Sequence, residues 1–111
     1  MKRTVLFIGY DSPVEHEIRD YIRDLAQEAY FARTHEQAIQ ILDEHPVEQA
    51  VLNLRAMSDA VILRYINLYY PEINIVVSAT KEFDDIISVF SQQNYSRLPQ
   101  PLKLEELKRM I

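Results

Sequence analysis

Five short apolar runs occur along the chain, and a segment with helical spacing follows each one. Most of these runs are continuous rather than alternating, which is typical of parallel strands buried on both faces. The segments between them carry apolar residues every three or four positions, which is typical of helices with one inward face. The predicted strands are Thr4 to Ile8, Glu28 to Ala32, Gln49 to Leu52, Ile73 to Val77 and Tyr95 to Leu98.

The helices that follow these strands have sequence signals for their first residues. Glu15 and Gln37 each come three residues after a hydroxyl residue, which is the spacing of a capping box. The expected N-caps are Ser12, Thr34, Ser58 and Thr80. The predicted inward stripes are Val14, Ile18, Tyr21, Ile22 and Leu25; Ala38, Ile41 and Leu42; Ile62, Tyr65, Ile66 and Tyr69; Phe83, Ile86, Ile87 and Phe90; and Leu104, Leu107 and Ile111.

This alternation predicts one α/β domain over residues 1–111. Strands joined through helices run parallel with right-handed crossovers, and apolar strands need helices on both faces of the sheet. The result is a doubly wound, five-stranded parallel sheet. Ligand sites of such sheets lie beyond the carboxyl ends of the strands. Functional residues are therefore expected in 9–11, 53–55, 78–80 and 99–101.

Composition narrows the class of protein further. The formal net charge of -5 gives no basic face for a phosphate backbone, so we expect no direct binding of nucleic acid. The chain has no cysteine, which excludes thiolate metal sites and fits a reducing compartment. No apolar run approaches the roughly 20 residues of a membrane span. We therefore expect a cytoplasmic protein without a membrane anchor.

Two segments resemble the receiver domain of two-component response regulators. Residues 97–102, Arg-Leu-Pro-Gln-Pro-Leu, followed by Leu-Glu-Glu-Leu at 104–107, resemble the aromatic-x-x-Lys-Pro segment and the last helix of that family. Residues 76–79, Val-Val-Ser-Ala, resemble its fourth strand. The resemblance extends over nearly all 111 residues. It implies a flavodoxin-like (βα)5 fold with strand order 2-1-3-4-5.

Receivers of this family transfer a phosphoryl group to an aspartate, and the resemblance implies where the required groups should lie. An acidic pair after the first strand holds Mg²⁺ in the family, because this ion needs carboxylate oxygens. Gly9 and Tyr10 stand at the two positions of that pair. Asp11 comes one position later, where with Glu15 and Glu17 it is expected to interact with the helix dipole.

The remaining family positions are altered as well, with one exception. Asn53 stands at the phosphoacceptor position, and an amide is no nucleophile toward phosphorus. Gln100 replaces the lysine that pairs with phosphate, although its amide can still form hydrogen bonds. Arg97 replaces the switch aromatic, while Ser78 is kept. The chain has one glycine, so it has no glycine-rich loop for nucleotide phosphates either.

These differences predict a pseudo-receiver that is not an enzyme and that needs no metal or cofactor. It is expected to act without phosphorylation, through contacts with a protein partner, its own output domain or a second copy. We expect the last helix and its neighbours to make these contacts and the natural protein to continue beyond Ile111. Two alternatives remain open: a phosphoacceptor that uses Asp11 or Ser78, and a small-ligand sensor that uses the vacated pocket.

Overall fold

A computed structural model of the protein describes residues 4–24, 28–90, 95–98, 100 and 102–110. Its centre is a five-stranded parallel sheet in the order β2-β1-β3-β4-β5, as predicted. The strands are β1 (Thr4–Ile8), β2 (Glu28–Ala32), β3 (Gln49–Asn53), β4 (Asn74–Ser78) and β5 (Tyr95–Leu98). The apolar runs therefore predicted all five strands, with shifts of one residue in β3 and β4.

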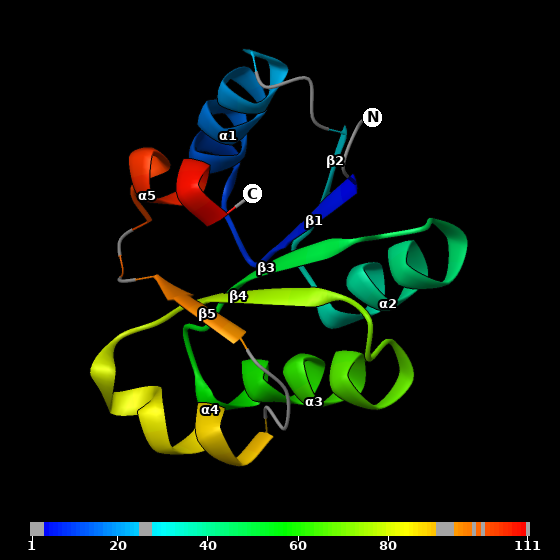
Figure 1. The fold of residues 1–111 in the computed structure, drawn as a ribbon, viewed down its shortest axis with the longest axis vertical. Coiled ribbons are helices and arrows are strands. Elements are labelled where there is room, and N and C mark those ends of the chain that lie inside the picture. Colours follow the sequence, from blue (N-terminus) through cyan, green and yellow to red (C-terminus); the bar gives the residue numbers. More distant parts are fainter. Residues whose placement is uncertain (1–3, 25–27, 91–94, 99, 101, 111) are drawn as a thin grey trace.

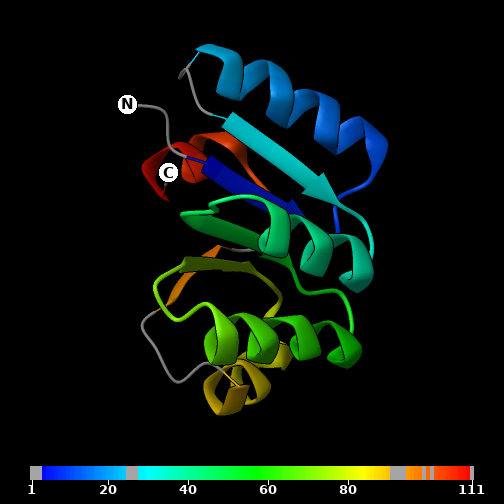
Figure 2. The same cartoon turned by 90° about the vertical axis from the view of Figure 1, so that its right-hand side faces the viewer.

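Helices cover both faces of this sheet. Figure 1 shows α1 and α5 on one face and α2, α3 and α4 on the other, and Figure 2 shows the same layers from the side. The α-helices are α1 (Ser12–Asp24), α2 (His35–Glu44), α3 (Ala60–Tyr69), α4 (Asp84–Phe90) and α5 (Leu104–Met110). Short 3-10 turns, η1 (Met57–Asp59) and η2 (Lys81–Phe83), precede α3 and α4.

The sheet separates two apolar cores. On the α1 and α5 side, Val5 and Phe7 of β1 pack with Ile18 and Leu107. Alternate residues of the same strands point into the larger core beneath α2, α3 and α4. Phe7 has no exposed surface, and truncation of a buried Phe typically costs about 3–5 kcal/mol. The central strands are thus packed on both faces.

Among the predicted N-caps, only Thr34 is confirmed. Its hydroxyl accepts a hydrogen bond from the backbone N–H of Gln37 at 3.1 Å. The assignment of Ser12 was wrong, because α1 already begins there and the carboxylate of Asp11 accepts from Val14 N–H at 3.3 Å. The Ser12 hydroxyl instead accepts a hydrogen bond from the Arg33 guanidinium. Asp11 therefore stabilises the start of the helix, as its position predicted.

The expected caps at Ser58 and Thr80 were also wrong. Asp59 is the N-cap residue of α3, and its carboxylate accepts from the backbone N–H groups of Arg55 and Ala56 at 2.9 and 3.0 Å. Thr80 donates its hydroxyl to Glu82 at 2.9 Å and makes no side-chain cap. Ser58 lies within the 3-10 turn η1, and the 3-10 turn η2 separates Thr80 from α4.

One inward residue of α3 was also assigned wrongly. Tyr69 is 66% exposed, whereas the next residue, Tyr70, is half-buried against the larger core. The Tyr70 hydroxyl donates to the Asp43 carboxylate, and this bond together with partial burial raises the pKa of Tyr70 to about 12. Within the part of the chain that the structure describes, no helix has the length and apolar character needed to cross a membrane.

Candidate functional site at the carboxyl ends of the strands

Parallel pairing brings most of the predicted site residues to one edge of the sheet. Asn53 at the end of β3 is paired with Ser78 at the end of β4, and Ser78 is paired with Leu98 of β5. Gly9 follows β1 on the other side of β3, and its N–H donates to Ala32 at 2.8 Å. Pro99 and Pro101 lie outside the described residues. Gly9, Tyr10, Asn53, Ser78 and Gln100 do come together there.

A chain of amide hydrogen bonds connects these strand ends. Gln100 Nε2 donates to Asn53 Oδ1 at 2.7 Å, and Asn53 Nδ2 donates to the Gly9 carbonyl at 3.0 Å. The same Gln100 nitrogen also lies 2.9 Å from the Leu54 carbonyl and 3.0 Å from the Ser78 carbonyl. We call the connection from Gln100 through Asn53 to Gly9 the amide chain. It joins the segment after β1, β3 and the segment after β5 without any charged group, and the bond from Gln100 to Ser78 adds β4.

Gly9 fits this edge because it has no side chain. Its φ is +87°, a conformation that residues with a Cβ atom rarely adopt. A Cβ atom added there would lie 3.2 Å from the Asn53 carbonyl oxygen and 3.4 Å from Arg55 Nη2. The first of these neighbours is backbone and cannot swing aside. A carboxylate at position 9 would therefore be strained as well as crowded.

Tyr10 belongs to the apolar core, and the edge of its side chain also lines the cavity described below. Its ring is buried and meets Phe7 edge-on, with ring centroids 6.3 Å apart. Burial raises the pKa of the Tyr10 hydroxyl, and the nearby Ser78 side chain offsets part of this rise. Ser78 itself is 0% exposed, so its hydroxyl is enclosed by the protein beside Tyr10.

Asp11 is not brought into the site. Its side chain is exposed and caps α1. A cavity of about 460 Å³ does open beside the amide chain, but Asp11 does not line it. Val14, Leu102 and Leu104 give this cavity an apolar wall, and Glu17 and Arg55 contribute one charge of each sign. Tyr10, Asn53 and Gln100 complete the lining.

The groups at this edge do not fit Mg²⁺, the ion that receivers hold there. Mg²⁺ requires an octahedral set of oxygen ligands, with carboxylates among them. Here the Asn53 side-chain oxygen and the Gly9 carbonyl already accept hydrogen bonds from amides. No group of three or more His, Asp or Glu side chains that could hold a metal occurs among the described residues.

Arg97 holds a second part of the same edge. Its guanidinium donates to the Thr80 carbonyl at 2.6 Å and to the Ala79 carbonyl at 3.3 Å, and it forms an ion pair with Asp84. We call this set the Arg97 tether, because it fixes β5 to the segment between β4 and α4. The sequence placed Arg97 at the switch position, and the acidic first turn of α4 was the signal for its partner.

Sequence reasoning also missed the role of Asp59. Besides its two backbone hydrogen bonds, Asp59 Oδ2 lies 3.8 Å from Arg55 Nε, and Oδ1 lies 3.4 Å from His35 Nε2. The four-residue spacing of Arg55 and Asp59 is the sequence signal for this contact. One oxygen of the Asp59 carboxylate thus holds the segment after β3, and the other contacts His35 of α2.

The fold is that of response-regulator receiver domains, although no protein-family model and no curated protein sequence matches the chain. One similar structure is the signal receiver domain of an HD domain-containing protein from Pseudomonas fluorescens, with a TM-score of 0.84 and 18% identity over 98% of this chain and 90% of that one. Another is the chemotaxis protein CheY4 of Vibrio cholerae, with a TM-score of 0.82 and 12% identity over 100% of both chains.

A third similar structure contains two proteins. It is a co-crystal from Saccharomyces cerevisiae of a histidine phosphotransfer signalling protein and the receiver domain of its downstream response regulator. The TM-score is 0.76, with 17% identity over 99% of this chain and 86% of that one. These likenesses confirm the predicted flavodoxin-like receiver fold and its strand order.

Proposed function

We propose that this domain, built on the receiver fold, is a regulatory module of signal transduction that does not take up phosphate. It is proposed to be non-enzymatic and to act through contacts with a partner protein, an output domain of its own protein or a second copy. The proposed location is the cytoplasm, with which the lack of cysteine is consistent. No direct binding of nucleic acid or of a membrane is proposed.

The observation that carries this proposal is the amide chain. An aspartate that attacks phosphorus needs a free carboxylate oxygen and a cation beside it to reduce repulsion between the two anions. At the corresponding position Asn53 offers an amide, and both of its polar atoms are already hydrogen-bonded within the protein. The two alternative phosphoacceptors are also unsuitable, since Ser78 is enclosed and Asp11 does not line the cavity.

Mass measurement after incubation with a small phosphodonor tests this directly. The intact protein is incubated with acetyl phosphate and Mg²⁺ beside a phosphorylatable receiver as the positive control. We expect an adduct on the control receiver and none on this protein or on its Asn53→Asp variant, because Gly9, Tyr10 and Gln100 still leave metal and phosphate unsupported. A stoichiometric phosphate adduct on the natural protein, mapped to Asp11 or Ser78, would contradict the proposal.

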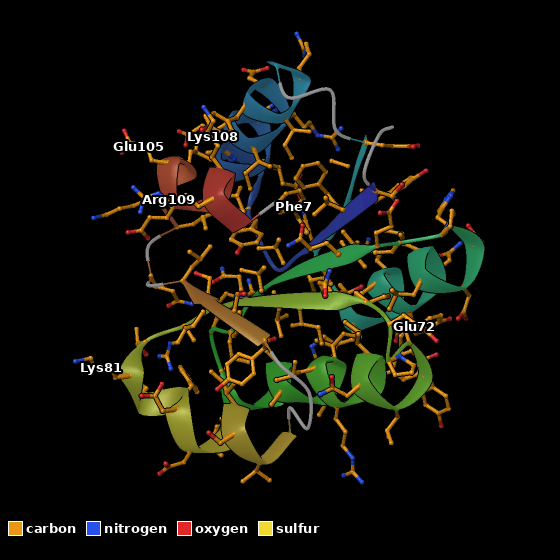
Figure 3. All side chains as sticks on the ribbon, viewed as in Figure 1. Phe7, Glu72, Lys81, Glu105, Lys108 and Arg109 are labelled. Atoms are coloured by element: carbon orange, nitrogen blue, oxygen red, sulfur yellow. The ribbon has the colours of Figure 1, made fainter. Side chains whose placement is uncertain are left out.

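Protein contact as the mode of action has support from the comparisons. The yeast receiver domain of the same fold was crystallised in complex with its phosphotransfer protein, so this fold does present surfaces that bind other proteins. We expected the last helix to be such a surface. Figure 3 shows Glu105, Lys108 and Arg109 of α5 pointing away from the sheet, and such a mixed charged face is typical of solvated helices.

A small-ligand sensor is the second candidate, and the cavity beside the amide chain favours it. Its volume of about 460 Å³ and its apolar wall suit a small organic molecule. Native mass spectrometry of freshly purified protein tests this candidate. A retained ligand that is lost in a Leu104→Asp variant would support a sensor. Protein purified from its natural source without any bound ligand would argue against the sensor and leave protein contact as the proposed function.

A further inference from the structure

We infer that two copies of this chain associate through the outer faces of α3 and α4. This inference rests on the proposed function and names the partner as a second copy. The large apolar side chains that remain exposed among the described residues gather on these two helices and on the turn before α3. They are Met57, Val61, Leu68, Tyr69 and Val89, each between 61% and 69% exposed.

On α3 these side chains form one stripe. Val61 and Leu68 are two turns apart, and Arg64 lies between them at helical spacing, so all three share one side of the helix. Met57 extends the stripe by another turn. The opposite side of α3 carries the buried residues Ile62, Leu63 and Ile66. Single exposed apolar residues are ordinary, but a contiguous stripe usually marks a contact surface.

Val89 continues this surface on the neighbouring helix. Helix α4 lies beside α3 in Figures 1 and 2 and is in contact with it. Asp84 is held by Arg97 of β5, which fixes one side of α4 toward β5. Ile86 lies on another side of α4 and is partly buried against the larger core, whereas Val89, three residues later, is 69% exposed on the outer surface of the helix. The exposed patch therefore spans both helices.

The charges on this patch are complementary to each other. Arg64 is the single ionisable group of α3 apart from its tyrosines, and α4 carries Asp84 and Asp85 with no base. Asp84 is used by the Arg97 tether, whereas Arg64 and Asp85 are exposed and, among the described residues, form no ion pair. The patch thus has an unpaired positive charge on one helix and an unpaired negative charge on the other.

A surface with this pattern fits a second copy of itself. A twofold interface places the same patch on both sides. Each contact between α3 of one copy and α4 of the other therefore occurs twice. Arg64 of each copy would face Asp85 of the other, and the apolar side chains of α3 and α4 would pack between the two pairs. The arrangement removes exposed apolar area from water and pairs both charges at once.

Sedimentation equilibrium of the purified protein over a concentration series tests this inference. We expect a monomer–dimer equilibrium for the natural protein. Val61→Glu should reduce it to monomer, while circular dichroism confirms an unchanged fold. Arg64→Glu and Asp85→Arg should each weaken dimerisation by about tenfold or more, because like charges then meet twice. The double variant R64E/D85R should recover most of the loss. Arg109→Glu on α5 is the matched control and should change nothing.

Each other outcome overturns the inference. A natural protein that stays monomeric at all concentrations rules out the second copy as the occupant of this patch. A dimer that tolerates Val61→Glu, or that shows no recovery in the double charge exchange, places the interface elsewhere. The phosphodonor experiment does not depend on association, so a failed dimer test leaves the phosphate-independent function standing and an adduct leaves the dimer question open to its own measurement.

Discussion

The amide chain and the Arg97 tether hold neighbouring parts of the same sheet edge by different electrostatic means. The amide chain uses neutral, partly buried groups, and it lies next to Ser78, which has no exposed surface. The tether uses a full ion pair, but the side chains of Arg97 and Asp84 are 28% and 52% exposed. Burial penalises an unpaired charge far more than a satisfied amide, whereas water at the rim tolerates charge. Each connection therefore suits its own degree of solvent access.

This comparison predicts the largest effect for a charge introduced into the amide chain. Asn53→Asp removes the donor to Gly9 and places a carboxylate oxygen beside the Gly9 carbonyl oxygen, which repels it. We therefore expect a loss of about 2–3 kcal/mol in the free energy of unfolding at neutral pH. The loss should shrink as the pH falls toward about 4, because a protonated carboxyl can donate again. Urea unfolding measures both effects.

Asn74→Asp at the exposed start of β4 is the matched control for that variant. It makes the same chemical change where no side-chain hydrogen bond of the amide chain is involved. If both variants lose equal stability, the amide chain has no special role in holding the edge.

Gly9→Ala should have the next largest effect. A methyl group must adopt the positive φ and approach the Asn53 carbonyl, and strain of this kind costs about 1–2 kcal/mol. Thermal unfolding measures the loss. A variant as stable as the natural protein would show that the backbone around Gly9 and Asn53 accommodates the methyl group at no cost. That result would contradict a fixed amide chain.

Arg97→Ala should cost about 1 kcal/mol, since its ion pair is partly exposed. Unlike the Asn53 effect, this one should decrease when salt is added, because salt screens exposed charges. A double-mutant cycle with Asp84→Ala in urea, at low and high salt, isolates the pair. A coupling energy that does not change with salt concentration would mean that the Arg97 tether is as shielded from solvent as the amide chain.

The smallest effect concerns alkaline pH. Tyr70 and Tyr10 have raised pKa values in the folded protein, so the unfolded chain loses these protons first. Their contribution is complete below the ordinary value of 10.0, and that of Tyr70 is lost as the pH rises to about 12. Tyr70→Phe should flatten the fall in unfolding free energy across this interval, and Tyr69→Phe is its exposed control. Equal curves for all three proteins would contradict the Tyr70–Asp43 hydrogen bond.

The fold could be predicted almost entirely from the chain, because continuous apolar runs determine strands buried on both faces. The start of a helix was harder to predict. Asp11 rather than the neighbouring Ser12 caps α1, and before α3 a 3-10 turn that the sequence pattern did not predict moves the N-cap position to Asp59. The inward assignment of Tyr69 was wrong because this residue lies at the margin of the apolar stripe of α3.

The site could be located from the sequence but its hydrogen bonds could not. Strand ends gave the positions of Asn53, Ser78 and Gln100. The bond between Gln100 and Asn53, however, joins residues 47 positions apart, and no local pattern predicts which amide faces which. The same holds for the conformation of Gly9, because a glycine after a strand permits a positive φ without requiring it.

The conformation of Gly9 also constrains anyone who would redesign this cleft to bind cations. Side-chain exchange alone supplies oxygen ligands only where the main chain can present them, and at residue 9 the main chain follows a path that suits glycine. The loop after β1 would have to be rebuilt together with its hydrogen bond to Asn53 before an acidic residue could point into the cleft. Grafting ligands without rebuilding that loop would yield a less stable protein that still binds no ion.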